Sequence, residues 1–409
     1  MIPLSLDEVS ELAPGRLRVG STARDVLGLQ TDSRRVEHGD LFVAVGGGIA
    51  FVEDALQQGA AAALVPDDAF AALAALAGRV RDRSSARFVA ITGSMGKTST
   101  KDILAAISTP QRRTVAAERS FNAEIGVPLT IGRVERDTEI CILELAMRGF
   151  GQIAELCAFA RPEVGVITNV GPVHLEKVGD LAGVMRAKSE LIAALPAGGT
   201  AIVPEDFPVE RDDIEVVSVG LDVTLEAFEP PVLRTSLGAL EVDFTARHLA
   251  VNALTAIATA NALELHLPDD LHVPFTGWRN EEIPLPGGGV LINDAWNANP
   301  VSMRAALEHL VQLAAGRPTI AVLGDMAELG TYSEQGHREV GRAVAELGID
   351  EVVAIGPQSV AYGGRHVDSV GEAIALLEEL VRPGACVLVK AARAMGLERV
   401  AEALTTVRA

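Results

Sequence analysis

The segment ITGSMGKTST, from Ile91 to Thr100, carries the residues of a phosphate-binding loop. It lies between an apolar stretch that predicts a strand and a pattern that predicts a helix starting near Thr98. Gly93 and Gly96 allow the backbone to approach phosphate oxygens closely, and the N–H groups at a helix N-terminus point at a bound anion. Lys97 adds a positive charge, and the Thr98 hydroxyl is placed to ligate Mg²⁺. The segment therefore predicts the phosphate site of a nucleotide.

The spacing within this loop is shorter than in the common P-loop. Only Ser94 and Met95 separate Gly93 from the Gly96–Lys97 pair. The same sequence could also form an ordinary glycine-rich turn with a solvated lysine. The strand before it, the helix after it and the position of the Lys-Thr pair favour phosphate binding. We therefore expect a nucleotide enzyme that uses the short form of the loop.

Polar side chains follow two further apolar strands. Glu144 ends the strand in EICILEL, and His174 follows the strand in EVGVITNV. Because the carboxyl ends of parallel strands meet at one edge of a sheet, we expect both residues near Lys97. A carboxylate beside phosphates is a suitable Mg²⁺ ligand. A glutamate that caps the following turn and a structural histidine remain alternatives at this point.

Two helical patterns add candidate residues. Lys188, in MRAKSELI, resembles a solvated helix lysine on composition alone. His248 and Asn252 stand at i and i+4 in ARHLAVN, which places them on one helical face suited to contacting a base or a ribose. A face that packs between domains is a comparable alternative.

The segment NDAWNANPVSM combines a strand end with several polar residues. Asp294, Asn297 and Asn299 precede a helix that Pro300 opens. Asn-Pro turns are common, but the density of polar side chains is high for a turn. We interpret the segment as part of a binding site.

Composition limits the class of partner. The 409 residues carry a formal net charge of −20, which argues against the basic patches that nucleic-acid binding needs. Cys141, Cys157 and Cys386 stand apart in apolar stretches and predict reduced core residues. The N-terminus lacks the pattern of a signal peptide, and no apolar run is long enough to cross a bilayer. We therefore expect a cytoplasmic protein without membrane insertion.

The length predicts two or three domains, and the pattern divides the chain into α/β blocks. The first block, 1–85, mixes short strands with helices, one of them over Val52 to Gln58, and ends at RVRDRSSAR. The second block, 86–273, alternates apolar strands with helices, which predicts a mainly parallel sheet covered on both faces. It closes with a helix from about Leu249 to Leu263. The Pro-rich segment from Pro268 to Pro286 is expected to be the second linker.

The third block, 274–409, repeats this alternation with strands in GVLINDAW, TIAVLGDM, EVVAIG and CVLVKA. It predicts a Rossmann-like domain, although it lacks a G-x-G-x-x-G fingerprint and so receives no dinucleotide site of its own. Ligands of such sheets gather beyond the C-terminal ends of the strands. The polar residues that stand there are Asp294, Asp325, Lys390 and Arg393.

Taken together and in this order, the segments resemble the Mur ligases, ATP-dependent amide-bond synthetases of peptidoglycan precursor assembly. The resemblance covers essentially the whole chain and is carried by TDSRRVEHGDLFVAV, ITGSMGKTSTK, FNAEIGVPLTI, ARPEVGVITNVGPVHLE, RAKSEL, NDAWNANPVSMRAAL and VLGDMAELG with SEQGHREVG. It implies a small α/β N-terminal domain (1–85) that recognises a UDP-linked substrate and a central ATP-binding domain (86–273). It also implies a C-terminal Rossmann-like domain (274–409) that binds the amino substrate.

The stretches NANP–SMRAAL and GDMAELG resemble the branch of the family that adds D-alanyl-D-alanine to UDP-N-acetylmuramoyl-tripeptide. The resemblance implies that ATP phosphorylates the terminal carboxylate of the peptide to an acyl phosphate. The amine of the dipeptide then attacks and expels phosphate. It thus implies a ligase that forms a C–N bond and releases ADP. The enzyme would act as a monomer, with ATP and with Mg²⁺ bound at two sites.

The resemblance also implies roles for individual residues. Lys97, Lys188 and His174 are expected to be catalytic, and Lys188 matches a lysine that the family carries as a carbamate. The expected magnesium ligands are Thr98, Glu144, His174 and Lys188. The expected ATP site comprises Gly93, Ser94, Gly96, Lys97, Thr98, Ser99, Asn122, His248, Asn252, Arg279 and Asp294. Ser33 is expected at the UDP-linked substrate, and Asn297 and Asn299 near D-alanyl-D-alanine.

The chain departs from the family pattern at several positions. After DLFVAV the family continues with a longer loop containing an Asp-Gly-His element that helps to hold UDP, whereas GGGIAFVEDA follows here. Ser120 and Ala123 stand where the family has asparagines, Leu249 follows His248 where the family has a His-Asn pair, and Trp296 replaces a tyrosine.

These departures leave two alternatives to the expected activity. One is a Mur-like amide ligase that joins a different carboxylate to a different amine, because the UDP-binding loop is short. The other is a scaffold without activity, which would have no need of the expected catalytic and magnesium-binding set.

Overall fold

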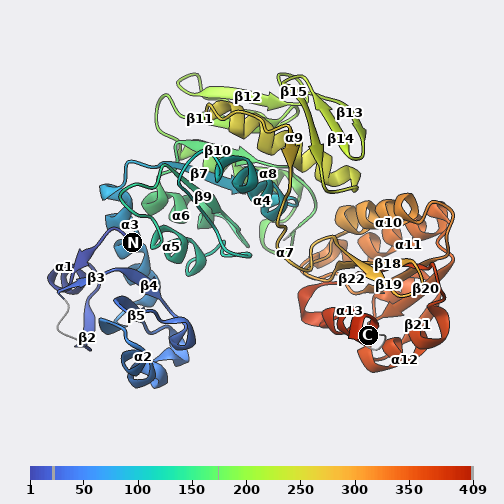
Figure 1. Ribbon diagram of the computed structural model, residues 1–409, viewed down its shortest axis with the longest axis horizontal. Helices are drawn as coiled ribbons and strands as arrows, with labels where there is room; N and C mark the ends of the chain where they lie inside the picture. Colours follow the sequence, from blue (N-terminus) through green and yellow to red (C-terminus); the bar gives the residue numbers. More distant parts are fainter. Residues whose placement is uncertain (21–23, 174, 407–409) are drawn as a thin grey trace.

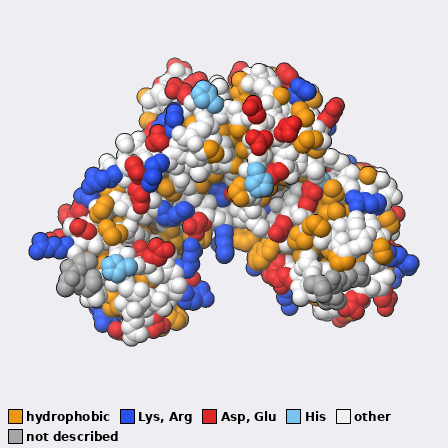
Figure 2. All heavy atoms as spheres, in the orientation of Figure 1, with side chains coloured by type: hydrophobic (Ala, Val, Ile, Leu, Met, Phe, Trp, Pro, Cys, Tyr) orange, Lys and Arg blue, Asp and Glu red, His pale blue; other side chains and the backbone are white. Residues whose placement is uncertain are grey.

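The computed structural model describes residues 1–20, 24–173 and 175–406. Figure 1 shows three bodies of secondary structure in sequence order, with the middle body between the other two. Figure 2 shows a deep hollow between the two outer bodies, beneath the middle one. Each body contains helices and at least one sheet with parallel strands. The predicted fold class, α/β with mainly parallel sheets, is confirmed.

The first body contains a four-stranded sheet in the order β2-β6-β5-β4. β4, β5 and β6 are parallel, and β2 runs antiparallel to β6. The strands are β1 (Leu4–Ser5), β2 (Gly15–Val19), β3 (Asp25–Val26), β4 (Gly28–Gln30), β5 (Asp40–Val43) and β6 (Ala62–Pro66), of which β1 and β3 form a separate pair. The helical segments are α1 (Leu6–Leu12), η1 (Ser33–Arg35), η2 (Gly46–Phe51), α2 (Val52–Gln58) and α3 (Ala69–Arg83). The helix predicted over Val52 to Gln58 is confirmed.

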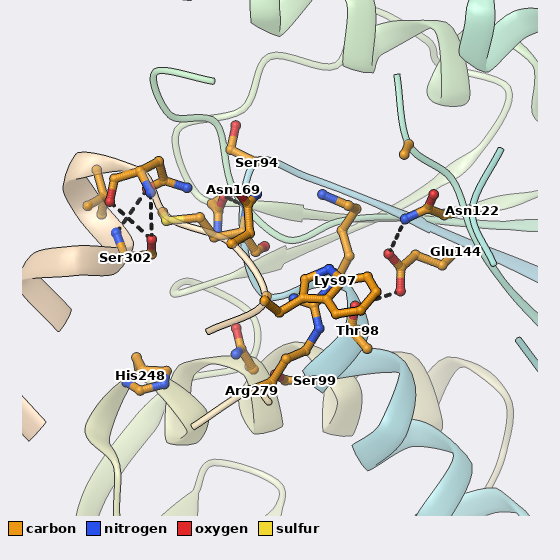
Figure 3. Close-up of a pocket in the computed structure, with 18 of the residues that line it drawn as sticks. Ser94, Lys97, Thr98, Ser99, Asn122, Glu144, Asn169, His248, Arg279 and Ser302 are labelled. Carbon is orange, nitrogen blue, oxygen red and sulfur yellow. Dashed lines mark hydrogen bonds between the residues drawn. The ribbon is translucent and has the colours of Figure 1, made fainter. Parts of the chain in front are cut away.

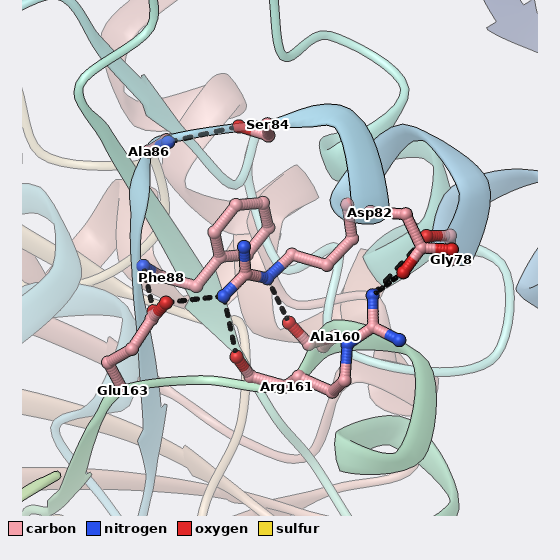
Figure 4. Close-up of polar contacts among 9 residues, drawn as sticks. Gly78, Asp82, Ser84, Ala86, Phe88, Ala160, Arg161 and Glu163 are labelled. Atoms are coloured by element: carbon pink, nitrogen blue, oxygen red, sulfur yellow. Dashed lines mark hydrogen bonds and ion pairs between the residues drawn. The ribbon is translucent and has the colours of Figure 1, made fainter. Parts of the chain in front are cut away.

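Helix α3 attaches the first body to the middle one. The Arg81 guanidinium donates hydrogen bonds to the carbonyls of Ala160 at 3.1 Å and Arg161 at 3.0 Å, and lies 4.2 Å from the centroid of the Phe88 ring. Glu163 pairs with Arg81 and accepts a hydrogen bond from the Phe88 backbone N–H at 2.7 Å (Figure 4). Because apolar residues of both bodies belong to one core cluster, the first body packs against the middle one over a shared core.

The middle body is built on a six-stranded parallel sheet in the order β12-β11-β10-β7-β9-β8. Its strands are β7 (Arg87–Thr92), β8 (Thr114–Ala116), β9 (Ile140–Glu144), β10 (Val164–Ile167), β11 (Thr200–Pro204) and β12 (Glu215–Val219). Its helices are α4 (Lys97–Ser108), α5 (Gly126–Ile131), α6 (Gln152–Ala160), α7 (Leu175–Val178) and α8 (Leu181–Ala193). Since β7 lies between β9 and β10, the segments that follow these two strands flank the phosphate-binding loop.

A second sheet of the middle body was not predicted from the sequence. β13 (Leu225–Glu229), β14 (Val232–Thr235) and β15 (Gly238–Val242) form an antiparallel meander, and β16 (Asp270–Leu271) adds in parallel to β15. The helix α9 (Arg247–Ala262) shares a core cluster with this meander and with α4, which confirms the predicted closing helix. The Pro-rich segment expected as a linker contains β16 and the first strand of the third body, so the true connection is shorter.

The third body has a six-stranded sheet in the order β17-β18-β22-β19-β20-β21. Only β17 runs antiparallel to its neighbour. The strands are β17 (Glu281–Leu285), β18 (Gly289–Asp294), β19 (Thr319–Gly324), β20 (Glu351–Ile355), β21 (Arg365–Val367) and β22 (Cys386–Lys390). The helical segments are α10 (Pro300–Ala314), η3 (Gly330–Tyr332), α11 (Ser333–Leu347), η4 (Ser359–Tyr362), α12 (Val370–Leu380), η5 (Arg393–Met395) and α13 (Glu398–Thr406). The predicted Rossmann-like alternation is confirmed.

The three cysteines are unpaired and buried, as predicted. Burial raises the pKa of the Cys157 thiol to about 12, so this thiol stays protonated near neutral pH. Within the described part of the chain, no helix is long and apolar enough to span a bilayer.

Candidate functional site

The loop between β7 and α4 packs so tightly that two of its positions accept only glycine. Gly93 and Gly96 have φ angles of 153° and 75°. A Cβ on Gly93 would stand 1.9 Å from Oγ1 of Thr168, and a Cβ on Gly96 would stand 2.3 Å from Oδ1 of Asn252. The backbone can therefore take the path of a phosphate-binding loop only because both residues lack a side chain.

Residues that follow β10 hold this loop from the side. The Asn169 side-chain oxygen accepts a hydrogen bond from the Met95 N–H at 2.9 Å, and the Asn169 carbonyl accepts one from the Ser94 N–H at 3.1 Å. Ser94 Oγ donates to the Gly171 carbonyl at 3.0 Å and accepts from the Gly171 N–H at 2.8 Å. These bonds fix the loop, while the N–H groups in the first turn of α4 have no intrahelical acceptor and are suited to bind phosphate.

Lys97 begins α4 and folds back over the loop. Its ammonium donates a hydrogen bond to the Gly93 carbonyl at 2.7 Å. Burial lowers the pKa of the Lys97 ammonium, the nearby Glu144 carboxylate opposes that effect, and the Arg279 guanidinium adds to it. A cation of this kind, partly stripped of water and beside a second cation, is stabilised by an anionic ligand such as a polyphosphate.

Glu144, at the end of β9, joins the phosphate loop to a neighbouring segment. Its two carboxylate oxygens accept hydrogen bonds at 2.8 Å each, one from the Thr98 hydroxyl and one from the Asn122 side-chain amide. Only 1% of Glu144 and 2% of Thr98 are exposed. Figure 3 shows this pair of bonds on one side of the cavity, with Ser302 on the other side. These two bonds hold the Glu144 carboxylate in one orientation at the end of the strand, beside the phosphate loop.

Lys188 is not the solvated lysine that composition alone suggested. It lies on α8 with 2% of its surface exposed. Burial, and secondly the charge of Lys97, hold the pKa of the Lys188 ammonium well below its usual value. Among the described residues, no carboxylate opposes these two effects on the pKa. The uncharged amine is therefore easier to form here than in a solvated lysine.

The phosphate loop from Ser94 to Ser99, together with Asn122 and Glu144, forms one side of a cavity of about 560 Å³ that reaches from the middle body to the third body. His248 and Asn252, one turn apart on α9, both line it. Burial lowers the pKa of the His248 imidazole to about 4, so the ring is neutral near pH 7. A neutral ring and an amide on one helical face are suited to contact a base or a ribose.

The connection between β16 and β17 carries Arg279 into the cavity. Its guanidinium donates a hydrogen bond through Nη2 to Ser120 Oγ at 2.9 Å and lies 5.3 Å from the centroid of the Trp296 ring. Nε of Arg279 is buried and has no hydrogen-bond partner among the described residues. A half-buried guanidinium with an unused donor is suited to bind an anion at this place.

Two neighbouring strands of the third body end in an ion pair at the cavity. Asp294 of β18 and Lys390 of β22 are register partners, and Lys390 Nζ donates to Asp294 Oδ2 at 2.5 Å. Nζ also donates to the Asn297 carbonyl at 2.9 Å. Lys390 is 2% exposed, so the pair is buried on the lysine side and holds the segment 294–297 in place.

Asn299 and Asn297 line the cavity, but each also has a local structural role. Asn299 caps α10, since its side-chain oxygen accepts from the Ser302 N–H at 2.9 Å and its own N–H donates to Ser302 Oγ at 3.0 Å. Asn297 accepts a hydrogen bond from the Ala298 N–H at 2.9 Å. The dense polar segment therefore forms the start of a helix and one wall of the cavity at once.

Most of the expected site residues come together in this one cavity. Those that line it are Ser94, Gly96, Lys97, Thr98, Ser99, Asn122, Glu144, His248, Asn252, Arg279, Asp294, Asn297 and Asn299. Gly93 and Lys188 do not line it, and Ser33 lies buried in η1 of the first body, away from it. His174 falls outside the described residues.

Sequence reasoning missed part of the cavity wall. Met147, Arg148 and Gln152 follow β9, and Glu328 follows β19. Val301, Ser302 and Ala305 come from the first turns of α10, where i, i+3 and i+4 spacing places them on one face. That spacing, next to the polar segment before the helix, was a signal that could have identified the α10 residues.

The residues present suit a magnesium nucleotide. Mg²⁺ in proteins usually has one or two carboxylate ligands together with substrate phosphates. Glu144 and the Thr98 hydroxyl provide such a set. Within the described residues, no cluster of three or more acidic, histidine or cysteine side chains forms a metal cage by itself. A site that needs phosphate oxygens to complete it fits this arrangement.

Comparisons with known proteins agree with this geometry. Residues 91–260 match the Mur ligase middle domain, and residues 278–393 match the family described as Mur ligase, glutamate ligase domain. The chain is 31% identical to the UDP-N-acetylmuramoyl-tripeptide–D-alanyl-D-alanine ligase of Bacillus subtilis (strain 168), over 99% of both chains. It is 32% identical to the protein of the same name from Escherichia coli (strain K12), again over 99% of both.

The fold comparison gives the same family. A crystal structure of MurF from Acinetobacter baumannii has a TM-score of 0.84 at 27% identity and covers 98% of each chain. The MurF ligase from Thermotoga maritima, solved in complex with ADP, has a TM-score of 0.79 at 26% identity, covering 92% of this chain and 96% of the other. With these matches along its whole length, the chain belongs to the Mur ligase family, in the branch of the UDP-N-acetylmuramoyl-tripeptide–D-alanyl-D-alanine ligases (MurF).

Proposed function

We propose that this chain joins D-alanyl-D-alanine to UDP-N-acetylmuramoyl-tripeptide, with ATP as the source of energy, in the synthesis of peptidoglycan precursors. The observation that carries this proposal is that one cavity is lined by the phosphate loop and Glu144 on one side and by the NANP segment on the other. A phosphoryl donor and an amine can therefore meet a carboxylate in one place, which ligation requires.

The chemistry has two steps. A carboxylate oxygen of the peptide bonds to the γ-phosphorus of ATP, and the bond from that phosphorus to ADP breaks. The amine nitrogen of the dipeptide then bonds to the carbonyl carbon, phosphate leaves with the former carboxylate oxygen, and the amine proton passes to solvent. Lys97 and Arg279 neutralise charge on the transferred phosphoryl group, which is the main requirement of such transfers.

Mg²⁺ would supply further charge neutralisation between the phosphates and the peptide carboxylate. We assign Thr98 and Glu144 as ligands at one site, and Lys188 and His174 at a second. Lys188 suits this role because its amine is buried and its pKa is lowered, which makes the uncharged form easier to reach. A neutral amine adds to CO₂ through its nitrogen and releases one proton, which gives a carbamate, an anionic oxygen ligand.

The other residues that line the cavity indicate where the nucleoside of ATP and the dipeptide would bind. We assign His248 and Asn252 to the adenine side and Asp294 to the ribose, since all three line the cavity. Asn297 and Asn299 are assigned to the dipeptide. Met147 and Arg148 line the same cavity, where Arg148 lies 3.9 Å from Glu328 in an ion pair, and they provide an apolar and a cationic group for the dipeptide.

The first body is assigned to the UDP-linked substrate, with Ser33 of η1 as a contact. We place the domain limits at 1–85, 86–273 and 274–409, because α3 ends at Arg83, β7 begins at Arg87, β16 ends at Leu271 and β17 begins at Glu281.

One observation favours a second candidate, a related ligase for another carboxylate and amine. Only Ala44, Val45 and the helical turn η2, Gly46–Phe51, separate β5 from α2, and η2 contains no buried residue. The alignment with the Bacillus subtilis enzyme extends over 460 residues, more than the 409 of this chain, so that relative has segments that this one lacks. A shorter loop would leave the UDP moiety with fewer contacts.

The test is a substrate matrix. ADP formation is measured with UDP-N-acetylmuramoyl-tripeptide and with the same peptide lacking UDP, each with D-alanyl-D-alanine, D-alanine or a tripeptide as acceptor. Turnover that needs both the UDP-linked peptide and D-alanyl-D-alanine supports the proposal. Equal or faster turnover with another pair supports the second candidate.

A further inference from the structure

Helix α4 carries a buried ion pair one turn beyond the phosphate loop. Lys101 Nζ lies 2.7 Å from Asp102 Oδ1, and the two side chains are 2% and 9% exposed. Asp102 stands at i+4 from Thr98, so it lies one turn below the phosphate end of the same helix. None of the roles assigned above uses this pair.

Asp102 holds the connection between the middle and third bodies. Its Oδ2 accepts a hydrogen bond from the Thr276 backbone N–H at 2.9 Å, and its Oδ1 accepts one from the Thr276 hydroxyl at 3.4 Å. Thr276 lies three residues before Arg279 and outside both matched family segments, which end at residue 260 and begin at residue 278. The contact therefore fixes the chain just before it delivers Arg279 to the cavity.

Lys101 holds the other side of Arg279. Its ammonium donates to the Ala117 carbonyl at 2.7 Å and to the Arg119 carbonyl at 3.3 Å. The next residue, Ser120, accepts the hydrogen bond from Arg279 at 2.9 Å. The contacts thus form a closed ring. Lys101 binds the carbonyl next to Ser120, and Ser120 binds Arg279. Thr276, three residues before Arg279, binds Asp102, which pairs with Lys101.

The backbone between Thr276 and the third body is in an unfavourable conformation. Trp278 and Asn280 have positive φ angles of 63° and 53°. The left-handed region is costly for a bulky residue such as tryptophan, so it persists only where surrounding contacts enforce it. The hydrogen bonds that Thr276 donates to Asp102 lie at the start of this strained segment and supply part of that constraint.

From this ring we infer that Lys101 and Asp102 are positioning residues, which set the guanidinium of Arg279 toward the ATP site by holding its two flanking segments to the phosphate-loop helix. The inference rests on the proposed function only in the identity of the anion that Arg279 meets. The placement of Arg279 itself is a property of the protein without ligand. Neither member of the pair touches the reacting groups.

The test uses the two tryptophans of the chain, Trp278 and Trp296, as a reporter. Their ring centroids are 6.1 Å apart, and the Arg279 guanidinium lies 5.3 Å from the Trp296 ring. Because a charge beside an indole shifts its emission, movement of Arg279 changes the fluorescence of the protein without any ligand. This readout does not depend on catalysis.

The variant is Asp102→Asn, which keeps the size of the side chain. The amide cannot accept hydrogen bonds from both neighbours. If its oxygen faces Thr276, its NH₂ group faces the Lys101 ammonium, and in the reverse orientation the NH₂ group faces the Thr276 N–H. We expect a shifted tryptophan emission, a rise of about tenfold in the KM for ATP and little change in the KM for D-alanyl-D-alanine. Unchanged emission together with an unchanged KM for ATP would overturn the inference.

A matched control is available in the third body. Asp350 Oδ2 accepts hydrogen bonds from the Thr319 N–H at 2.8 Å and the Thr319 hydroxyl at 2.9 Å, the same pair of contacts away from the cavity. Asp350→Asn is expected to lower thermal stability and to leave both the emission and the KM for ATP unchanged. If Asp350→Asn changes the emission and the KM for ATP as Asp102→Asn does, the effect comes from a general loss of stability and the inference fails.

A double-mutant cycle shows whether Asp102 acts through Arg279. In an Arg279→Ala background, Asp102→Asn is expected to add less than about twofold to the KM for ATP, because the group it positions is gone. The same factor in both backgrounds would contradict the inference. If Asp102→Asn does not fold, Ser120→Ala removes the other anchor of Arg279 and is expected to shift emission and KM in the same directions.

The outcomes also separate this inference from the proposed function. A chain that ligates other substrates still shows the emission shift in Asp102→Asn and the control result in Asp350→Asn. A chain that ligates the proposed substrates, with no emission shift in Asp102→Asn or Ser120→Ala, retains the function and loses the inference.

Discussion

The Thr98 hydroxyl donates a hydrogen bond to the Glu144 carboxylate at 2.8 Å, and this contact joins the phosphate-loop helix to the end of the neighbouring strand. Both side chains are almost completely buried. The second oxygen of Glu144 is held by the Asn122 amide, also at 2.8 Å. The carboxylate is therefore oriented before any cation arrives, which reduces the reorganisation needed when a metal nucleotide binds.

Glu144→Gln is expected to reduce ATP turnover on the order of a hundredfold and to raise the Mg²⁺ concentration needed for half-maximal activity. The amide has the shape of the carboxylate but lacks its charge, so it is a weaker ligand. Phosphate release is measured against Mg²⁺ concentration. Glu155→Gln, on α6 and outside the cavity lining, is the control and is expected to behave as wild type. An unchanged Mg²⁺ dependence in Glu144→Gln would remove this residue from the metal site.

Lys188→Ala is expected to abolish activity, and a short carboxylate such as acetate or formate is expected to restore part of it. The small anion would take the place of the carbamate, which alanine cannot form. Lys177→Ala, an exposed lysine on α7, is the control. Wild-type rates in Lys188→Ala, or restoration by chloride as well as by carboxylates, would contradict the carbamate assignment.

His248 predicts a specific dependence of stability on pH. Its folded-state pKa, about 4, is lower than its ordinary value of 6.5. Between these values the unfolded chain binds the proton and the folded chain does not, so this histidine lowers stability as the pH falls from 6.5 toward 4. His248→Gln is expected to flatten the curve of unfolding free energy against pH in that window and to leave it unchanged above pH 7. Equal slopes in the two proteins would show that the ring is not buried in the neutral form.

Lys390→Met is expected to destabilise the third body by roughly 3 kcal/mol, because it leaves the Asp294 carboxylate partly buried without its cation. The double variant Asp294→Asn, Lys390→Met is expected to recover much of that loss, since neither charge remains. Denaturant unfolding of the three proteins gives the comparison. A double variant less stable than Lys390→Met would mean that Asp294 is held by contacts other than this pair.

The elements that the sequence predicted well are those whose pattern is local. The strands before the phosphate loop, Glu144 and Asp294 are continuous apolar runs, and the face of α9 with His248 and Asn252 follows from the helical period. These features place most of the cavity wall. The family resemblance added the order of the domains and the chemistry, and the whole-length matches confirmed the family.

The features that the sequence did not predict depend on contacts far along the chain. The meander β13–β15 consists of short strands with mixed polarity, and they are stabilised by packing on α9 rather than by their own pattern. The pairing of Asp294 with Lys390 requires β18 and β22 to be neighbours, although several elements separate them in sequence. The position of Arg279 depends on the left-handed conformation of Trp278, which residue type disfavours.

The most direct test of the proposed reaction follows an oxygen atom. UDP-N-acetylmuramoyl-tripeptide labelled with ¹⁸O in its terminal carboxylate is incubated with ATP, Mg²⁺ and D-alanyl-D-alanine, and the released phosphate is analysed by mass spectrometry. Because the carboxylate oxygen attacks phosphorus and leaves with it, we expect one ¹⁸O atom in each phosphate when both carboxylate oxygens are labelled, and amide product in equal amount. Product formed with unlabelled phosphate, or phosphate released without product, would contradict the account.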